Sequence, residues 1–221
     1  MSGLEILITG GTGYVGGKLI PLLLARDHRV RALARPASRD RVPPGAQVIA
    51  GDALRADSVA AALKPADTVV HLVGTPHPSP AKAKQFQEID LPSIRATVEA
   101  AKRVSIAHLI YVSVAQPAPV MRAYQAVRAQ GEALIREAGL TATIIRPWYV
   151  LGPGHWWPVG LVPIYKIMEA LPSTRESARR LGLVTLNQMV NALVHAVEHS
   201  PAAQQQSIVD VPAIRRAAID A

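Results

Sequence analysis

The sequence predicts an α/β protein built on a doubly wound parallel sheet. Three observations support this fold class: short apolar runs alternate with helical patterns, glycines cluster directly after the first run, and the composition is 49% hydrophobic but only 4% aromatic. A core made mainly of Ala, Val, Leu and Ile is expected for a parallel sheet held between helices. Because parallel strands need long crossovers, the helical segments between the apolar runs supply the connections.

The apolar runs predict the strands and the periodic stretches predict the helices. Strands are expected at residues 4–9, 30–33, 47–50, 68–73, 109–114, 141–145 and 207–211. Helices are expected at residues 14–26, 58–63, 81–103, 122–138 and 187–199. The third helix is expected in two pieces, because Asp90 and Pro92 resemble an N-cap and a first turn. Gly139 stops the fourth helix, and Thr185 with Gln188 forms a capping box for the fifth.

The length of 221 residues fits a single domain spanning residues 1–221. Residues 152–184 break the alternation and are rich in Pro, Gly and Trp, so we expect them to form a small cap on the substrate side. Within it, the apolar stretch His155–Tyr165 is expected to form a cap wall over the nicotinamide and is open to two other interpretations, a dimer contact and an interfacial membrane patch. The side chains expected to line an apolar substrate pocket are Tyr149, His155, Trp156 and Trp157.

Composition and spacing exclude or disfavour several classes of function. The absence of cysteine excludes disulfides, thiolate catalysis, iron–sulfur clusters and Cys-ligated zinc. No metal site is expected, since the pair His195 and His199 lies on the last helix, away from the predicted ligand crevice. The net charge of +8 comes mostly from scattered Arg residues, which favours an anionic cofactor over nucleic acid. With no signal peptide and no apolar run of about 20 residues, a soluble cytoplasmic protein without an integral membrane segment is expected.

The stretch after the first strand has the pattern of a phosphate-binding turn. It reads Gly10-Gly11-Thr12-Gly13-Tyr14-Val15-Gly16 and contains G-x-G-x-x-G. Glycine is needed where the chain turns off the strand, where the backbone approaches a pyrophosphate, and where the helix packs on the sheet. The free amides and the positive end of the following helix then bind the pyrophosphate. Because the motif follows a predicted strand and opens a predicted helix, it indicates a dinucleotide site.

The residues after the second strand indicate which dinucleotide is bound. An NAD site usually has an acidic residue there for the ribose 2′-hydroxyl. No acidic residue lies between Asp27 and Asp40, whereas Arg35 and Arg39 could bind a 2′-phosphate through charge-assisted hydrogen bonds. The sequence therefore favours NADP and leaves NAD open.

Further landmarks follow the other predicted strands. They are Gly51-Asp52, His71–Gly74, Tyr111–Ser113, Tyr124-x-x-x-Arg128, and the segment from Arg146-Pro147 to Gly152-Pro153. With the glycine loop, these landmarks make the chain resemble the atypical and extended short-chain dehydrogenases/reductases, including the NmrA-like NAD(P)-binding proteins. The resemblance runs from Leu4 to about Val211 and implies a Rossmann-type fold.

The resemblance implies roles for residues at matching positions. Asp52 would accept a hydrogen bond from the adenine amino group, and Ser113 would orient a substrate carbonyl or hydroxyl. Positions implied to lie along the cofactor are Ala53 and Leu54 near the adenine, Val73, Gly74 and Thr75 beneath the ribose and phosphates, and Pro147 and Val150 beside the nicotinamide. Two of these have ordinary structural interpretations as well, since Asp52 could be a turn residue and Ser113 a strand end.

The expected catalytic pair departs from the family pattern. The resemblance implies a Tyr as acid/base, with a Lys one helical turn later. Here Tyr124 and Arg128 keep the i, i+4 spacing, so both are expected on one helix face. Arg keeps the charge that stabilises a phenolate, but its planar group cannot replace an ammonium that also binds the ribose hydroxyls. This departure leaves proton transfer by Tyr124 open.

Two functions fit the sequence. The first is an NADP(H)-dependent oxidoreductase for a small, apolar carbonyl, alcohol or enone, with Tyr124 as acid/base, Ser113 polarising the oxygen and Arg128 supplying charge. The second is an NADP(H)-binding redox sensor or assembly protein that does not turn the cofactor over, which the missing Lys favours. A small-molecule substrate is the expected partner, and a homodimer remains open.

Overall fold

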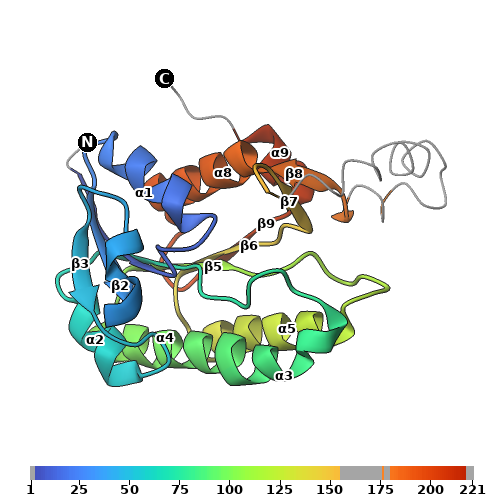
Figure 1. Ribbon diagram of the computed structural model, residues 1–221, viewed down its shortest axis with the longest axis horizontal. Helices are drawn as coiled ribbons and strands as arrows, with labels where there is room; N and C mark the ends of the chain where they lie inside the picture. The colour runs from blue at the N-terminus through green and yellow to red at the C-terminus, as the bar shows by residue number, and fades with distance from the viewer. Residues whose placement is uncertain (1–2, 155–175, 177–179, 218–221) are drawn as a thin grey trace.

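A computed structural model describes residues 3–154, 176 and 180–217 of the chain. Its centre is a seven-stranded sheet in which every neighbouring pair of strands is parallel, in the order β3-β2-β1-β4-β5-β6-β9 (Figure 1). The strands are β1 (Glu5–Thr9), β2 (Arg29–Ala34), β3 (Gln47–Ala50), β4 (Thr68–His71), β5 (His108–Val112), β6 (Ala142–Ile145) and β9 (Gln206–Val209). The predicted doubly wound α/β fold is confirmed.

Helices cover both faces of this sheet (Figure 1). On one face lie α1 (Gly16–Leu24), α8 (Leu186–Glu198) and α9 (Val211–Arg216). On the other lie α2 (Ala56–Leu63), α4 (Leu91–Val104) and α5 (Arg122–Glu137). Each layer encloses its own aliphatic core against the sheet, because β1, β4, β5 and β6 are buried on both sides.

The strand order reverses between β1 and β4, which are neighbours although β2 and β3 follow β1 in the chain. Chain connections leave the sheet in opposite directions at this point, so a crevice opens at the carboxyl ends of these two strands. Thr9 ends β1 and pairs with His71 at the end of β4. The glycine-rich stretch therefore begins at the topological switch point, where this fold class binds its ligands.

Most predicted elements agree with the structure to within a few residues at their ends. The capping box of Thr185 and Gln188 is present, and Gly139 has the positive φ that ends α5. A small parallel pair, β7 (Tyr149–Leu151) with β8 (Leu183–Thr185), was not predicted, and neither was α9, which Asp210 caps. Segments this short carry too little periodicity to be found from the sequence.

The prediction for residues 81–103 was wrong in one respect. Asp90 does not cap a new helix, because its dihedral angles are helical and its side chain makes no cap hydrogen bond. Instead, the short turns η2 (Pro80–Lys82) and α3 (Ala83–Gln85) lead into a π-helical turn, η3 (Phe86–Asp90), that runs directly into α4. The wider turn points the Asp90 carboxylate inward, where it is buried.

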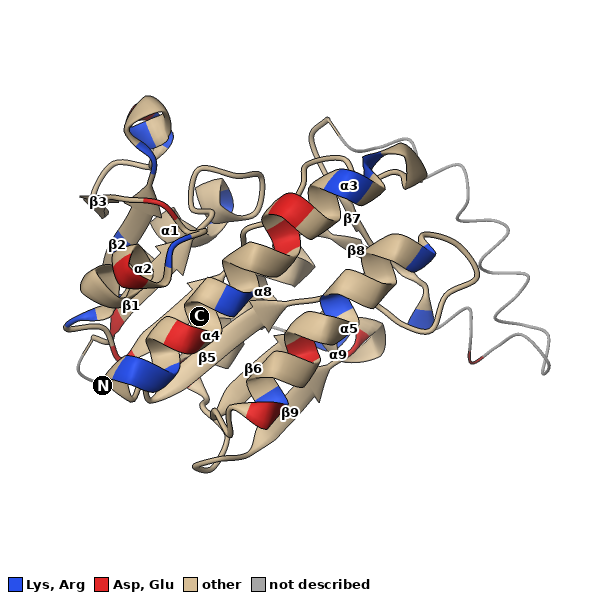
Figure 2. Ribbon diagram, turned by 90° about the horizontal axis from the view of Figure 1, so that it is seen from below, with Lys and Arg blue, Asp and Glu red and all other residues tan. Residues whose placement is uncertain are grey.

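Among the described residues, no helix is both long enough and apolar enough to cross a membrane. Acidic and basic residues are interspersed along α4 and α5, on the face shown in Figure 2. Most of the predicted cap, residues 152–184, falls outside the described residues, so its arrangement and the single-domain boundary stay predictions.

Candidate dinucleotide-binding site

The turn after β1 has the geometry that the glycine motif predicts. Gly10 has φ +77°, and a Cβ there would lie 2.7–2.9 Å from the backbone of Leu72 and Val73 on the neighbouring chain segment. A Cβ on Gly16 would lie 2.6–2.8 Å from the backbone of Gly10 and Gly11. Both glycines are therefore required by close backbone approach, and at Gly10 by the left-handed conformation as well.

The start of α1 leaves donors for an anion. Regular backbone hydrogen bonding begins with Gly17, Lys18 and Leu19, which donate to Gly13 and Val15. In the part of the chain that the structure describes, the amides of Val15 and Gly16 have no backbone acceptor. Such amides at a helix N-terminus bind phosphate oxygens, so the loop fits the diphosphate of a dinucleotide.

Basic side chains lie next to this loop. The pairing of Thr9 with Leu33 places Arg35, which follows β2 and is exposed, beside the glycine turn. A short 3₁₀ helix, η1 (Pro36–Arg41), then turns back so that Arg41 donates from Nη2 to the carbonyl of Thr12 at 3.1 Å. Sequence reasoning missed Arg41, although it lies only two residues after Arg39.

The other predicted 2′-phosphate ligand, Arg39, is differently placed. Its guanidinium is 67% exposed and lies 3.5 Å from the carboxylate of Asp40. Of these three arginines, the structure gives Arg41 a contact with the loop, whereas Arg39 contacts Asp40 and the Arg35 side chain is exposed after β2.

The residues predicted near the adenine follow β3. Asp52 accepts a hydrogen bond from the Leu54 amide at 3.0 Å, as in an Asx turn, and its own amide donates to Ser58 Oγ at 2.8 Å. Leu54 is 40% exposed, and Ala53 packs at the edge of the α2 core. The turn interpretation of Asp52 is thus present in the structure, and its contact with adenine stays a prediction.

The segment after β4 is held by a buried carboxylate. Asp90 Oδ2 accepts hydrogen bonds from the Thr75 amide at 2.9 Å and the Thr75 hydroxyl at 2.6 Å. Asp90 Oδ1 accepts from Arg128 at 2.7 Å, and the two side chains are 0% and 6% exposed. Gly74 lies against the guanidinium, because a Cβ there would overlap Arg128 Nη2. The predicted Val73–Thr75 cofactor segment therefore rests on an ion pair that connects it to α5.

Arg128 is buried, and two of its nitrogens bind protein groups, whereas its Nε has no hydrogen-bond partner among the described residues. Its Nη1 donates to the carbonyl of Val112 at 3.0 Å, at the end of β5, and its Nη2 binds Asp90. The guanidinium carbon lies 5.0 Å from the ring centre of Tyr124 and 5.7 Å from that of Tyr111. The expected pair Tyr124 and Arg128 is thus brought together. The guanidinium is buried among these protein groups and lies on the inner side of the Tyr124 ring.

Tyr124 is half-buried near the start of α5. Its ring also packs against Phe86, with ring centres 5.0 Å apart, so it is fixed between the π-helical turn and Arg128. Tyr111 beneath it is fully buried, and burial raises the pKa of its phenol, which stays neutral. Gly131 provides the room for that phenol, since a Cβ there would lie 2.6 Å from its oxygen.

Ser113 belongs to a separate buried cluster. Its hydroxyl donates to Glu132 at 2.5 Å, and the residue is only 2% exposed. Glu132 also accepts from Gln116 at 3.1 Å and forms an ion pair with Arg146 at the end of β6. In this arrangement the Ser113 hydroxyl can accept a further hydrogen bond but has no proton left to donate, and the structure gives it no contact with Tyr124.

A buried histidine lies beneath the crevice at the end of β4. His71 Nδ1 is 3.1 Å from the Thr9 hydroxyl and 3.0 Å from the Thr97 hydroxyl, and Nε2 is 3.3 Å from the Ser93 hydroxyl. Complete burial, together with the charge of Arg128, lowers the pKa of His71 to about 3, so the imidazole is neutral. Its surroundings of hydroxyls, with no carboxylate contact, indicate a structural role under the site.

The predicted nicotinamide side is described in part. Pro147 is buried, and its carbonyl accepts from the Ala115 amide at 2.8 Å. Tyr149 and Val150 are half-buried on β7, and burial raises the pKa of Tyr149. The predicted pocket residues His155, Trp156 and Trp157 lie outside the described residues. Within the described ranges, no group of three His, Cys, Asp or Glu residues could hold a metal ion.

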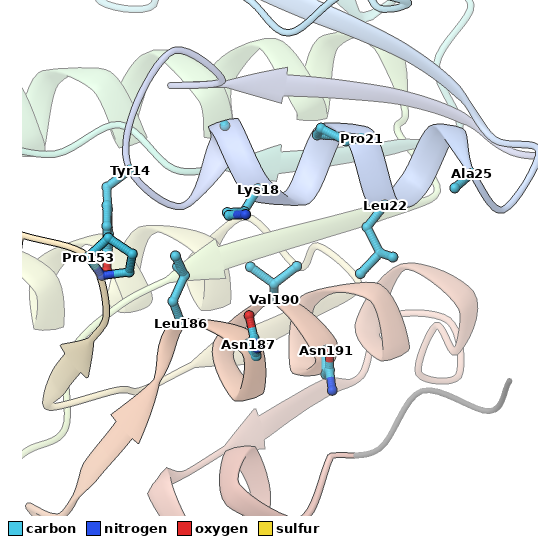
Figure 3. A pocket seen from close by; sticks show the side chains of 11 residues that line it. Tyr14, Lys18, Pro21, Leu22, Ala25, Pro153, Leu186, Asn187, Val190 and Asn191 are labelled. Carbon is cyan, nitrogen blue, oxygen red and sulfur yellow. The ribbon is translucent and has the colours of Figure 1, made fainter.

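A groove of about 580 Å³ runs between α1 and α8 (Figure 3). Leu22, Val190 and Pro21 line its middle, with Lys18 and Asn187 toward the end where both helices begin. Tyr14 and Pro153 form that end, next to the glycine loop. Sequence reasoning did not predict this groove, because its lining comes from helices far apart in the chain.

Residues 10–153 match the family described as NAD(P)H-binding. The match begins at the first glycine of the loop and covers more than half of the chain. The chain belongs to this NAD(P)H-binding family. The predicted resemblance to the atypical short-chain dehydrogenases/reductases, NmrA-like proteins included, is confirmed with it, and so is the expectation of a nicotinamide cofactor in general terms.

Comparison with individual proteins agrees with the family. The chain is 29% identical to the ceramide reductase of Caulobacter vibrioides over 182 residues, which are 79% of this chain and 55% of that protein. It is 28% identical to the photosystem II assembly factor Ycf39 of Cyanophora paradoxa over 65% of this chain and 44% of that protein. The fold is similar to that of the Bordetella bronchiseptica enzyme WbmH, solved with NAD+, with a TM-score of 0.67, 18% identity, and 92% of this chain and 74% of that one covered. The chain thus spans about half the length of the curated relatives that it matches.

Proposed function

We propose that the protein is an NADP(H)-dependent oxidoreductase acting on a small, apolar carbonyl, alcohol or enone. The observation that carries the proposal is the amide-lined turn at the start of α1, with Arg41 in contact with it and Arg35 following the neighbouring strand β2. When bound, the nicotinamide supplies or accepts the hydride. One relative carries the name ceramide reductase, which supports a substrate with apolar character.

The chain's own residues would bind and orient the reactants. The amides of Val15 and Gly16 would hold the diphosphate, and Gly74 with Thr75 would support the ribose from below, fixed by Asp90. Tyr124 would transfer the proton at the substrate oxygen from its phenol, with the Arg128 charge beneath its ring. Ser113 would accept a hydrogen bond from a substrate hydroxyl, because its own proton is committed to Glu132.

Selectivity for NADPH is expected to depend on the cations beside the loop. Replacing Arg35 by alanine should weaken NADPH binding by about 10- to 100-fold, the effect of losing a charge-assisted hydrogen bond, and leave NADH nearly unchanged. Arg41→Ala should also weaken NADPH binding more than NADH binding. It should weaken NADH binding slightly as well, because the contact between Arg41 and Thr12 is lost. Dissociation constants of both dinucleotides, measured by fluorescence titration, check this.

Arg39→Ala is the matched control for these two variants, because it removes the same guanidinium group from the same basic segment after β2. Its pairing with Asp40 and its exposure predict less than a threefold effect on NADPH. A larger loss at Arg39 than at Arg41 would make Arg39 the second phosphate ligand. Equal losses of NADPH and NADH affinity in Arg35→Ala would contradict NADP selectivity.

A second function is favoured by one specific observation. Arg128 is buried against Asp90, Val112 and the two tyrosine rings, so the cation one helical turn after Tyr124 is not exposed to bind the cofactor ribose. A protein that binds NADP(H) without turning it over, as a redox sensor or assembly factor, needs no such cation. One relative carries the name of an assembly factor, which supports this alternative.

Turnover distinguishes the two functions. The protein is mixed with NADPH and a panel of aldehydes, ketones, enones and quinones that includes long-chain members, and the loss of nicotinamide absorbance is followed. We expect oxidation of NADPH that Tyr124→Phe reduces by about 100-fold or more, since general acid catalysis contributes that much. Tight NADPH binding without oxidation by any member of the panel would support the second function. A Tyr124→Phe variant that stays active would contradict the assignment of Tyr124 as the proton donor.

A further inference from the structure

Gly152 lies against the phosphate loop although it is far from it in the sequence. It follows β7, is buried, and does not have a positive φ. A Cβ at this position would overlap the hydroxyl of Tyr14 and would lie 3.4 Å from its Cζ atom and 3.2 Å from Leu186 Cβ. The residue is therefore glycine because the Tyr14 phenol occupies the space of a side chain, and not because of its backbone conformation.

This contact joins two parts of the site. Tyr14 lies in the glycine loop, directly before Val15 and Gly16, whose amides have no backbone acceptor among the described residues. Gly152 directly follows the strand that carries Val150, on the nicotinamide side of the proposed site. Figure 3 shows the Tyr14 side chain reaching from the loop ahead of α1 to Pro153, with Leu186 at the start of α8 beside it.

We propose that Gly152 is a positioning residue for the cofactor, which acts through Tyr14. Because residue 152 has no side chain, the Tyr14 phenol packs against the end of β7. This contact fixes the orientation of the Val15 and Gly16 amides. A larger residue displaces Tyr14 and moves those amides with it. The inference rests on the proposed function only in that a dinucleotide diphosphate occupies the loop, and it requires no preference for NADP.

Adding one methyl group tests the inference. We expect Gly152→Ala to raise the dissociation constants of NADPH and NADH alike by about tenfold or more, the effect of weakening a charge-assisted hydrogen bond from an amide to the diphosphate. The ratio of the two constants should not change, since the diphosphate is common to both dinucleotides. Circular dichroism and thermal unfolding show whether the variant keeps its fold.

A compensating change separates positioning from general damage. In Tyr14→Phe/Gly152→Ala the overlapping hydroxyl is gone and the new methyl group meets the ring carbon at 3.4 Å, while the tighter 3.2 Å contact with Leu186 Cβ is the same in both variants that carry the Gly152→Ala change. We expect this double variant to bind both dinucleotides within about threefold of Tyr14→Phe alone, a difference below 1 kcal/mol. Gly17→Ala is the matched control, because a Cβ there would meet nothing within 4 Å, and its affinity should equal that of the wild type.

Two results would overturn the inference. One is a Gly152→Ala variant that binds the dinucleotides as the wild type does. The other is a double variant no better than Gly152→Ala, whether the damage appears as lost folding or as lost affinity. A wild-type protein that binds NADH as tightly as NADPH would contradict the NADP proposal and leave this inference intact, whereas a wild type that binds neither would remove the proposed function before any variant is made.

Discussion

Replacing Arg128 by methionine is expected to lower the free energy of unfolding by about 3–5 kcal/mol, because it leaves a carboxylate buried without its counter-ion. Asp90 is completely buried and its Oδ1 has Arg128 as its cationic partner, at 2.7 Å. Methionine has a similar length and keeps much of the packing against Tyr111 and Tyr124. Urea unfolding followed by circular dichroism at pH 7.5 measures the loss.

The matched control is an arginine whose ion pairs are exposed. Arg103 binds both Asp57 and Glu99, yet its side chain is 48% exposed, so Arg103→Met should cost far less. The double variant Asp90→Asn/Arg128→Met should recover part of the stability, since the uncompensated charge is gone. If Arg128→Met proved as mild as Arg103→Met, the buried pair would not be what holds the Gly74–Thr75 segment to α5.

Lowering the pH from 7.5 to 5 is expected to destabilise the protein by about 2 kcal/mol for each of two buried histidines. Burial lowers the pKa of His71 to about 3 and that of His108 to about 4, whereas both titrate near 6.5 in the unfolded chain. Between these values the unfolded chain binds protons that the folded chain does not. The stability that the two neutral histidines contribute is therefore complete above pH 6.5. It is lost as the pH falls toward their pKa values in the folded protein.

The slope of stability against pH tests this more directly than its absolute value. His71→Asn loses hydrogen bonds to Thr9, Thr97 or Ser93 and should be less stable at pH 7.5. The slope of its unfolding free energy against pH should be smaller than that of the wild type by the equivalent of about one bound proton. His199→Asn is the control for replacing an exposed histidine, because its ring lies on the surface directly after α8. Parallel slopes for the wild type and His71→Asn would show that His71 is not held neutral in the folded state.

The fold could be predicted from the sequence because its signals are local and repeated. The strand Gln47–Ala50 was predicted with its observed limits, and the glycine loop lies at the switch point as its motif requires. Each such element carries its own apolar run or glycine pattern, so an error in one does not affect the others. The pair β7 and β8 lacks such a pattern, because three-residue strands are defined by the partner rather than by their own sequence.

The candidate site could be predicted only in part, because its side chains combine over long distances in the chain. The i, i+4 spacing correctly brought Tyr124 and Arg128 together, but nothing local indicated that Asp90, 38 residues earlier, would bind the guanidinium. Likewise, the Ser113 hydroxyl is bound by Glu132, a residue that the sequence did not single out. Arg41 could have been considered from its position in the basic segment after β2, whereas its contact with Thr12 depends on how that segment turns back.

One buried and one partly buried ion pair on α5 have a consequence for how this protein adapts to ligands. Arg128 forms an ion pair with Asp90, which directly precedes α4. One turn later, Glu132 forms an ion pair with Arg146, which directly follows β6. A helix held at two successive turns by different elements cannot rotate or slide without breaking an ion pair, and the Arg128–Asp90 pair is buried. Tyr124 is consequently carried on a fixed support, and variation in which molecules the site accepts has to arise from the opposite wall of the crevice.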